Sequence, residues 1–350
     1  MRHYPLGSVD RSDSTHKFGI TDLTFYPFDS LAFLSSSYDA TLKIYSSETL
    51  QPSASFALDS AIYAHALSPI ASHLMVACAT QHPAIRLVDL RSGASVQALA
   101  GHAGAVMTVA WSPVDEYILA SGGTDGTVRF WDVRRSAGQL GLLDVADSIG
   151  IGGYDGFGQG ARRRERGRAH AGPVNGVVWT EDGRHLISTG HDEKIRVWST
   201  TTGANTLANF GPVVKNRNLS RLLPCLVPMS LTDSGKDVLF FLSEKELLMY
   251  EMFEGKLIKR LKAPVTSLAA VTEDAPSGKN TGSRRLKDLA WRPHNIEMYS
   301  AQADGSIQAW KPHVAEETSD DEDAEEEQKL KRKALDDIYE DLAKRRMLVP

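Results

Sequence analysis

The chain has 350 residues and a formal net charge of −5; 42% of its residues are hydrophobic and 24% are charged. It has no run of about 18 consecutive apolar residues and no apolar stretch near its start, so we expect neither a membrane span nor a secretory signal. Its two cysteines, Cys78 and Cys225, lie far apart, which excludes a disulfide scaffold and a cysteine-rich zinc site and is typical of a reducing compartment.

Residues 1–15 read as an N-terminal extension, after which polar and aromatic residues recur at fixed distances. In the clearest unit, Asp125 follows His102 by 23 residues and Ser121 by four, and it precedes Trp131 by six. Three further groups share this spacing to within one residue, the last without a histidine: His16, Ser35, Asp39 and Tyr45; His170, Ser188, Asp192 and Trp198; and Ser300, Asp304 and Trp310. Weaker units occupy 84–91 and 238–250, which gives six units with a period near 43 residues.

Each unit consists of short apolar runs separated by turn residues such as Asp125-Gly126. Alternating runs of this length, with turns roughly every 8–12 residues, are typical of antiparallel β-strands. A period of about 40–45 residues with Gly-His and Trp-Asp pairs indicates an all-β WD-repeat β-propeller. We therefore predict a propeller with six recognisable blades over 16–313, with insertions at about 146–168 and 272–285, followed by a tail over 314–350.

The recurring His, Ser, Asp and Trp have the residue types of a hydrolase triad, so an enzyme is one interpretation. A catalytic site occurs once, whereas this set recurs in unit after unit, which favours a structural hydrogen-bonded chain inside each blade. We therefore predict no catalytic, cofactor or metal-binding residue, and no enzymatic activity.

Several stretches resemble a particular family. They include 25–45, 88–93, 101–138 and 205–211, in the same order as in the Cockayne syndrome A protein family. Members of that family are propeller substrate receptors of cullin-4 RING ubiquitin ligases in transcription-coupled nucleotide excision repair. The family also carries N-terminal docking helices and a further first blade, which have no counterpart in this sequence.

The resemblance implies an adaptor-binding site. Receptors of this class carry a Trp-Asp-x-Arg ending on consecutive blades, and its arginine contacts the adaptor, damage-specific DNA-binding protein 1. Here Asp132 and Arg134 follow Trp131 in this pattern, and Asp89 and Arg91 match it without the tryptophan. The alternative is that these are ordinary strand-end ion pairs.

The segments outside the units are compositionally biased. Residues 150–160 are glycine-rich and lack the Gly-Lys-Ser/Thr of a phosphate-binding loop. A possible basic patch follows, which could attract phosphate or an acidic partner, or could be a solvated loop: Arg162, Arg163, Arg164, Arg166 and Arg168. Nine carboxylates fall within 316–327, and basic clusters at 329–333 and 344–346 suit a nuclear import signal or the ends of a solvated tail helix.

The sequence thus predicts a nuclear protein-binding scaffold. By resemblance, its partners are the damage-specific DNA-binding protein 1 adaptor with its cullin-4 RING ligase, and the RNA polymerase II repair complex with its SWI/SNF-type ATPase. We expect no membrane association and no direct sequence-specific nucleic-acid binding. The alternative is a generic nuclear WD-repeat scaffold in RNA processing or chromatin, without a ligase.

Overall fold

The structure is a computed structural model that describes residues 7–311, apart from 11, 13, 71, 136–137, 146–166, 233–235, 245, 263–285, 293–296 and 304. The chain divides into two compact units, Met1–Ala309 and Trp310–Pro350. The first unit contains the β-sheets, apart from the last residue of the final strand. The predicted insertion at 272–285, most of the one at 146–168, and the tail from residue 312 lie outside the described residues.

The described strands form six antiparallel sheets, each built from strands that follow one another in the chain. The first three sheets are β1 (Ile20–Tyr26), β2 (Asp29–Ser37), β3 (Thr41–Ser46), β4 (Pro52–Ala57); β5 (Ile62–Leu67), β6 (Met75–Thr80), β7 (Ala84–Asp89), β8 (Ala94–Ala100); and β9 (Val106–Trp111), β10 (Ile118–Gly123), β11 (Val128–Asp132), β12 (Gln139–Leu142). The last three are β13 (Val174–Trp179), β14 (His185–Gly190), β15 (Lys194–Ser199); β16 (Cys225–Leu226), β17 (Val238–Ser243), β18 (Glu246–Glu251), β19 (Leu257–Lys262); and β20 (Leu286–Arg292), β21 (Glu297–Gln302), β22 (Ile307–Trp310). A short 3₁₀ helix covers Met229–Leu231.

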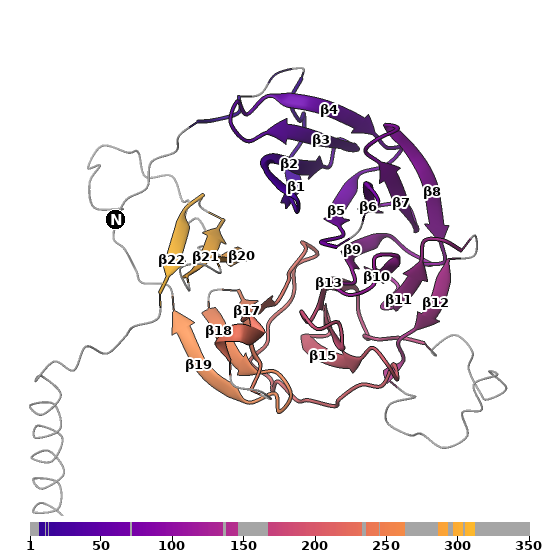
Figure 1. The fold of residues 1–350 in the computed structure, drawn as a ribbon. Helices are drawn as coiled ribbons and strands as arrows, with labels where there is room; N and C mark the ends of the chain where they lie inside the picture. The colour runs from indigo at the N-terminus through magenta and orange to yellow at the C-terminus, as the bar shows by residue number, and fades with distance from the viewer. Residues whose placement is uncertain are drawn as a thin grey trace, which may run out of the picture. The chain divides into compact units, whose positions relative to one another are not determined.

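The sheets succeed one another around a centre, with the first strand of each sheet innermost (Figure 1). This arrangement is a six-bladed WD40 β-propeller, which confirms the predicted fold class. The two weaker repeat units correspond to complete sheets, the second and the fifth.

In the first, third and fourth sheets, the turn between the second and third strands requires an unusual backbone. The residue that follows the repeat aspartate has a positive φ, at 63° for Ala40, 76° for Gly126 and 58° for Glu193. Only glycine adopts this left-handed conformation without strain. The left-handed residue is thus kept whether or not it is glycine. In two of these turns the aspartate carboxylate accepts a backbone N–H two residues on, from Thr41 to Asp39 at 3.0 Å and from Thr127 to Asp125 at 3.1 Å.

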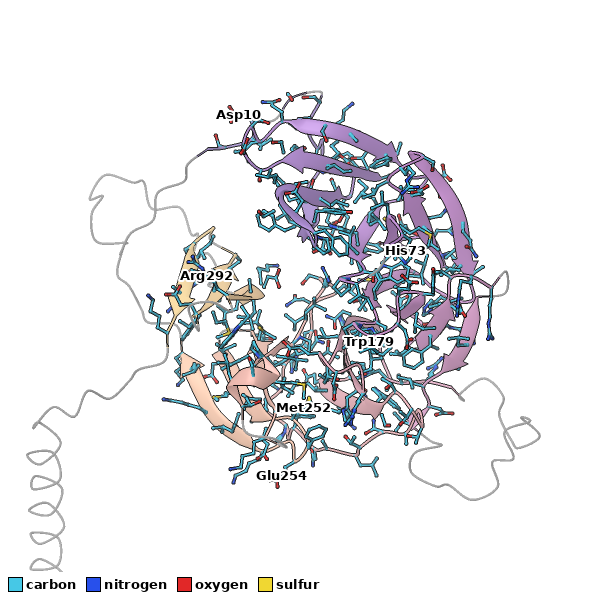
Figure 2. All side chains as sticks on the ribbon, in the orientation of Figure 1. Asp10, His73, Trp179, Met252, Glu254 and Arg292 are labelled. Atoms are coloured by element: carbon cyan, nitrogen blue, oxygen red, sulfur yellow. The ribbon has the colours of Figure 1, made fainter. Side chains whose placement is uncertain are left out.

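Apolar side chains fill the space between neighbouring sheets (Figure 2). At the seam between the second and third sheets, for example, Leu87 packs in one cluster with Val109 and Trp111. The innermost strands add a polar tie, because Trp111 Nε1–H donates to the carbonyl of Ala66 at 3.0 Å and Trp179 Nε1–H donates to that of Ala110 at 3.1 Å. Each of these tryptophans therefore fastens its own sheet to the preceding one.

Candidate protein-binding face

The repeated polar residues meet in three sheets and form a directed hydrogen-bond chain. In the third sheet, Trp131 Nε1–H donates to Ser121 Oγ at 2.8 Å, Ser121 Oγ lies 2.7 Å from His102 Nε2, and His102 Nδ1 lies 3.1 Å from Asp125 Oδ2. Because the carboxylate only accepts, Nδ1 carries the imidazole proton and Nε2 accepts from the serine. Each group thus donates and accepts in turn, from tryptophan to aspartate.

The fourth and first sheets repeat this geometry. His170 lies 2.8 Å from Asp192 Oδ1 and 2.7 Å from Ser188 Oγ, to which Trp198 donates at 2.9 Å. In the first sheet, His16 lies 3.1 Å from Asp39 Oδ2 and 2.6 Å from Ser35 Oγ, and Tyr45 takes the place of the tryptophan. In the sixth sheet Ser300 is buried and Trp310 ends β22, whereas Asp304 lies outside the described residues.

These sets have the internal distances of a catalytic triad, but the serine hydroxyls are inaccessible. Ser121 and Ser188 are fully buried, and each hydroxyl already receives a tryptophan N–H and faces a histidine. A nucleophile must reach a substrate carbonyl, which these oxygens cannot do without unfolding the blade. The sets therefore stabilise the sheets and do not form an active site.

The hydrogen-bond chains also determine the charge of the aspartate at their end and of the histidine beside it. Burial opposes ionisation of the Asp39 carboxyl, but hydrogen bonds from Thr41, Lys17 and His16 lower its pKa to about 2. In the same way, burial is outweighed at Asp125 and Asp192 by hydrogen bonds from His102 and His170, which hold both carboxyl pKa values well below their usual range. Burial lowers the pKa of His170 despite the neighbouring Asp192, so this imidazole is neutral at pH 7.

The two predicted arginine sites lie where the third strands of the second and third sheets end. We call this end of the ring the Asp-x-Arg face. Arg134 is fixed there by a bidentate pair with Asp132, with Nε 3.0 Å from Oδ1 and Nη2 2.9 Å from Oδ2. Its guanidinium lies 4.7 Å from the centre of the Tyr117 ring, and its side chain is 60% exposed. A planar donor group is thus held ready on the surface.

The second site is less constrained. Asp89 ends β7 at the same register as Asp132 ends β11, because they pair with Met75 and Ile118 at the starts of the second strands. The Asp89 carboxylate accepts the backbone N–H of Arg91 at 3.0 Å, as Asp132 does from the N–H of Arg134. The shared turn places both arginines on one face, and in the third sheet the arginine and aspartate side chains also form a bidentate pair.

A bridge that sequence reasoning missed joins the loops beside these two sites. His73, in the loop before β6, lies 2.7 Å through Nε2 from the carbonyl of Glu116, in the loop between β9 and β10. Its ring packs 4.9 Å from Trp111 and 5.7 Å from Tyr117, between centroids. Ser72 adds a hydrogen bond to Glu116 Oε2 at 3.4 Å. Nothing in the repeat spacing marks a contact between different sheets, so nothing in the sequence singles out His73.

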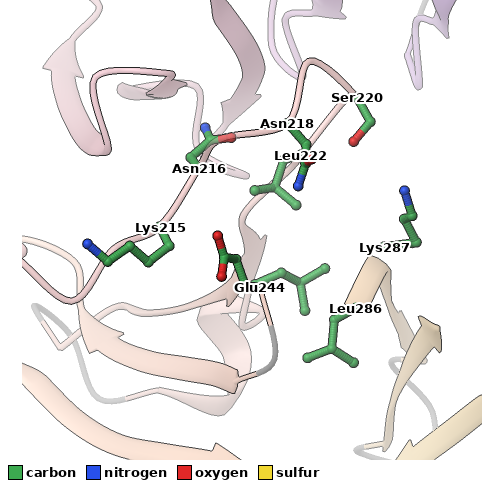
Figure 3. A pocket seen from close by; sticks show the side chains of 9 residues that line it. Lys215, Asn216, Asn218, Ser220, Leu222, Glu244, Leu286 and Lys287 are labelled. Carbon is green, nitrogen blue, oxygen red and sulfur yellow. The ribbon is translucent and has the colours of Figure 1, made fainter. Parts of the chain in front are cut away.

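A second contact missed by sequence reasoning lies at the centre of the ring. The segment between β15 and β16 carries Asn216, Asn218 and Ser220 (Figure 3). It runs inward (Figure 1) and is held by the paired amides of Asn175 and Asn216 at 2.8 and 2.9 Å. It places Arg221 against Asp22 of β1 in an ion pair. Asp22 also accepts the backbone N–H of His65 at 3.1 Å. This segment therefore ties the fourth and fifth sheets to the first and second.

The structure does not place the predicted basic patch as a whole. Arg162, Arg163, Arg164 and Arg166 lie outside the described residues, and Arg168 is exposed beside Val145. In the described part of the chain, no group of three or more His, Cys, Asp or Glu residues is arranged to hold a metal ion. The described residues also contain no helix of the length and apolarity that a membrane crossing needs. Burial raises the thiol pKa of Cys78 and Cys225 to about 12, so neither is a ready nucleophile.

Comparisons with known proteins agree with this architecture. The model of the WD domain, G-beta repeat, matches residues 7–46, 93–132 and 164–199. The chain is similar to the WD repeat-containing protein ATCSA-1 of Arabidopsis thaliana, with 28% identity over 93% of this chain and 80% of that protein. This similarity confirms the resemblance found in the sequence.

Other relatives match over shorter lengths. Radiation-sensitive protein 28 of Saccharomyces cerevisiae is 26% identical over 74% of this chain and 54% of its own length. Ribosome biogenesis protein YTM1 of Phaeosphaeria nodorum is 30% identical over 52% of this chain and 38% of its own length. A chain in the solved structure named Crystal Structure of Mitotic Checkpoint Complex has a TM-score of 0.60 at 17% identity, covering 87% of this chain and 77% of that chain, which shows the shared fold.

Proposed function

We propose that this WD-repeat scaffold is the substrate-recognition subunit of a cullin-4 RING ubiquitin ligase acting in transcription-coupled nucleotide excision repair. It would work in the nucleus and bind damage-specific DNA-binding protein 1 through the Asp-x-Arg face. The RNA polymerase II repair complex and its SWI/SNF-type ATPase would be presented on the remaining surface. The similarity to ATCSA-1 along 93% of the chain supports the assignment.

The observation that carries the adaptor site is the fixed guanidinium of Arg134. An exposed ion pair by itself contributes under about 1 kcal/mol to folding, so the arrangement has little value for stability. Held between the Asp132 carboxylate and the Tyr117 ring, however, Arg134 loses little side-chain freedom when a partner binds. Its remaining N–H groups can donate to carbonyl or carboxylate oxygens of that partner.

Binding between the purified chain and purified damage-specific DNA-binding protein 1 tests this proposal. We expect the double substitution Arg91→Ala and Arg134→Ala to weaken the affinity at least tenfold. Arg217→Ala is the matched control, because Arg217 is also exposed and also paired to a carboxylate, Glu193 at 2.7 Å, but lies at the opposite end of the sheets. Equal binding by the wild type and the double variant would contradict the assigned face.

A second candidate is a nuclear scaffold in RNA processing or chromatin without a ligase. The matches to the ribosome biogenesis proteins named YTM1 favour it, although they cover about half of this chain. No measurable affinity of the wild-type chain for the adaptor, together with stable folding, would favour this alternative.

A further inference from the structure

The fourth sheet lacks the outermost strand that the first, second, third and fifth sheets have. In those sheets a fourth strand pairs along the third, as β8 does along the whole of β7. In the fourth sheet β15 is itself the outermost strand (Figure 1), and the chain that follows it makes one isolated bridge, between Trp198 and Asn205. The edge of β15 from Lys194 to Arg196 therefore has no strand beside it in the described part of the chain.

The segment after this bridge turns away from β15 because its own side chains hold it in turns. Leu207 has a left-handed backbone with a φ of 59°, and its N–H donates to Asn205 Oδ1 at 2.6 Å. The N–H of Gly211 donates in the same way to Asn209 Oδ1 at 3.0 Å. Local hydrogen bonds of this kind compete with strand pairing. The segment 205–211 thus leaves the edge of β15 open.

The backbone groups of Ile195 point toward this open edge. Val197 shows the direction, since its carbonyl accepts the N–H of Thr206 from the outer side at 2.9 Å, and residues two apart in a strand direct their backbone groups the same way. In the third sheet, the carbonyl of Val128, which also stands three residues before the repeat tryptophan, accepts the N–H of Leu143 at 3.0 Å. Ile195 therefore offers one donor and one acceptor at the place where an antiparallel strand binds.

A groove of about 660 Å³ lies beside the open edge and is lined by β15 and by the segment that turns away from it. Phe210 already fills the seam toward the fifth sheet, where it packs in one cluster with Ile195 and meets the Tyr250 ring at 5.3 Å between centroids. A strand that enters the groove therefore needs only a small side chain opposite Ile195.

The charges of the groove favour an acidic strand. Its other charged side chains pair with one another, Asp192 with Arg196 at 2.7 Å and Glu193 with Lys215 at 3.3 Å. Lys194 is exposed and forms no ion pair within the part of the chain that the structure describes. A carboxylate on the residue opposite Lys194 supplies the missing partner, since opposite charges on paired strands stabilise a sheet.

We propose that the open edge of β15 binds an extended segment of a partner protein as an antiparallel fourth strand, with a small residue opposite Ile195 and a carboxylate opposite Lys194. Main-chain hydrogen bonds supply the affinity, and the two side chains supply the selectivity. Both positions lie at the start of β15, at the opposite end of the sheets from the Asp-x-Arg face. Binding there does not depend on the adaptor.

A second copy of the chain is a poor occupant of this edge. Two β15 strands paired antiparallel about Ile195 set Lys194 of each copy against Arg196 of the other. Like charges directly opposite each other destabilise a sheet. We therefore expect the edge to stay open in the purified chain.

Hydrogen exchange of the full chain tests whether the edge is open. We expect the Ile195 amide to exchange at least about tenfold faster than that of Val128, its equivalent beside a fourth strand. Exchange at Ile195 as slow as at Val128 would overturn the proposal, because another part of the chain or a second copy would already cover the edge.

Disulfide capture of a short peptide tests the occupant. Leu207 lines the groove and is 58% exposed, so Leu207→Cys places a reactive thiol there, whereas burial raises the thiol pKa of Cys78 and Cys225. The probe is acetyl-Cys-Gly-Gly-Thr-Ala-Glu-Val-Thr-amide, whose alanine is placed opposite Ile195.

The control peptide is N-methylated at the alanine, so it cannot donate to the Ile195 carbonyl. At equilibrium with a small reducing thiol, we expect the probe to be captured at least about tenfold more strongly than the methylated peptide. A probe with leucine in place of alanine should also be captured less than the parent, because Phe210 fills the seam. Equal capture of the methylated peptide, or a preference for leucine, would overturn the proposal.

A charge exchange tests the acidic residue of the partner. In the Leu207→Cys chain, Lys194→Glu should lower capture of the probe about fivefold, and a probe with lysine in place of glutamate should recover it. Lys259→Glu is the matched control, because Lys259 is also an exposed strand lysine but lies in β19 of the fifth sheet. If Lys194→Glu changes capture no more than Lys259→Glu does, the groove does not select an acidic strand and the proposal is wrong.

Discussion

The second and third sheets are neighbours in the ring, but different kinds of side chain fill the same register positions in their interiors. In the third sheet, Ser121 and Trp131 belong to a polar chain that runs to His102 and Asp125. In the second sheet, the same register positions hold Cys78 and Val88, which pack among apolar residues such as Leu42. A blade can therefore be built with or without the polar chain, but the polar version depends on every member being satisfied.

The fifth sheet keeps an aromatic residue at the tryptophan position of the repeat but has no serine at the serine position. Phe241 stands at the serine position and Tyr250 at the tryptophan position. Among the described residues, the buried hydroxyl of Tyr250 has no hydrogen-bond partner. Burial raises the pKa of this phenol. The aromatic ring is thus retained for packing, as its place in the apolar cluster with Leu239 shows, while the polar chain is lost.

The largest difference in stability between the two sheets should come from Trp131, at the aromatic end of the hydrogen-bond chain. We expect Trp131→Ala to lower the free energy of unfolding by about 3–5 kcal/mol, because it opens a cavity and removes a hydrogen bond. Val88→Ala, the matched change in the second sheet, should cost about 1–2 kcal/mol through loss of two methyl groups. Urea unfolding of both variants measures the difference, and equal losses would break the comparison.

Removal of the central hydroxyl should have the next largest effect. Ser121→Ala leaves Trp131 Nε1 and His102 Nε2 buried without a partner, at a cost of about 1–3 kcal/mol for each such group. Cys78→Ala removes only a sulfur from an apolar site, so we expect a smaller loss there. If Ser121→Ala proved as mild as Cys78→Ala in chemical denaturation, the hydrogen-bond chain would contribute nothing beyond packing.

The polar chains should also make stability depend on pH. The pKa of His170 is lowered in the folded state, so its share of stability is present above its unfolded pKa near 6.5 and declines as the pH falls below that value. The pKa of Asp39, lowered to about 2, adds a second decline as the pH falls from about 4. Unfolding measured between pH 7 and pH 3 should show both declines, and His170→Gln should reduce the first. A flat profile above pH 5 would contradict this assignment.

The two arginine sites should differ in their effect on adaptor binding. Arg134 is held in place by Asp132 and Tyr117, so Arg134→Ala should weaken binding roughly tenfold, whereas Arg91→Ala should weaken it about threefold. Neither change should alter the free energy of unfolding by more than about 1 kcal/mol. Titration calorimetry of the single variants gives both affinities, and a larger effect at Arg91 would reverse the ranking.

The smallest effect on adaptor affinity should come from Tyr117, whose aromatic ring lies against the Arg134 guanidinium. Tyr117→Leu removes a cation–π contact worth about 0.5–1 kcal/mol, which corresponds to a two- to fivefold loss of adaptor affinity. Tyr117→Phe keeps the aromatic face and should bind like the wild type. Loss of affinity in the phenylalanine variant would mean that the hydroxyl, and not the ring, positions the arginine.

The sequence was most informative about features that lie within one repeat. The fixed distances from His102 to Asp125 and Trp131 predicted the fold, because all members of that chain belong to one sheet. Contacts between sheets leave no such periodic mark. For this reason His73 against Glu116, and Arg221 against Asp22, could not be foreseen, although both determine how neighbouring sheets are held. The exposure of Phe25 could not be predicted either, because its residue type is typical of a buried position and its burial depends on what lies beside its sheet.

The ion pair between Asp22 and Arg221 has a consequence for the order of assembly. Asp22 lies in β1 and Arg221 lies in the segment between β15 and β16, so the strands of the first four sheets separate most of the sequence between them. Contacts between such distant residues form slowly, since a long loop must close first. During synthesis, Asp22 can therefore meet its ion-pair partner only after residue 221 has left the ribosome, when the strands of the first four sheets have already been made.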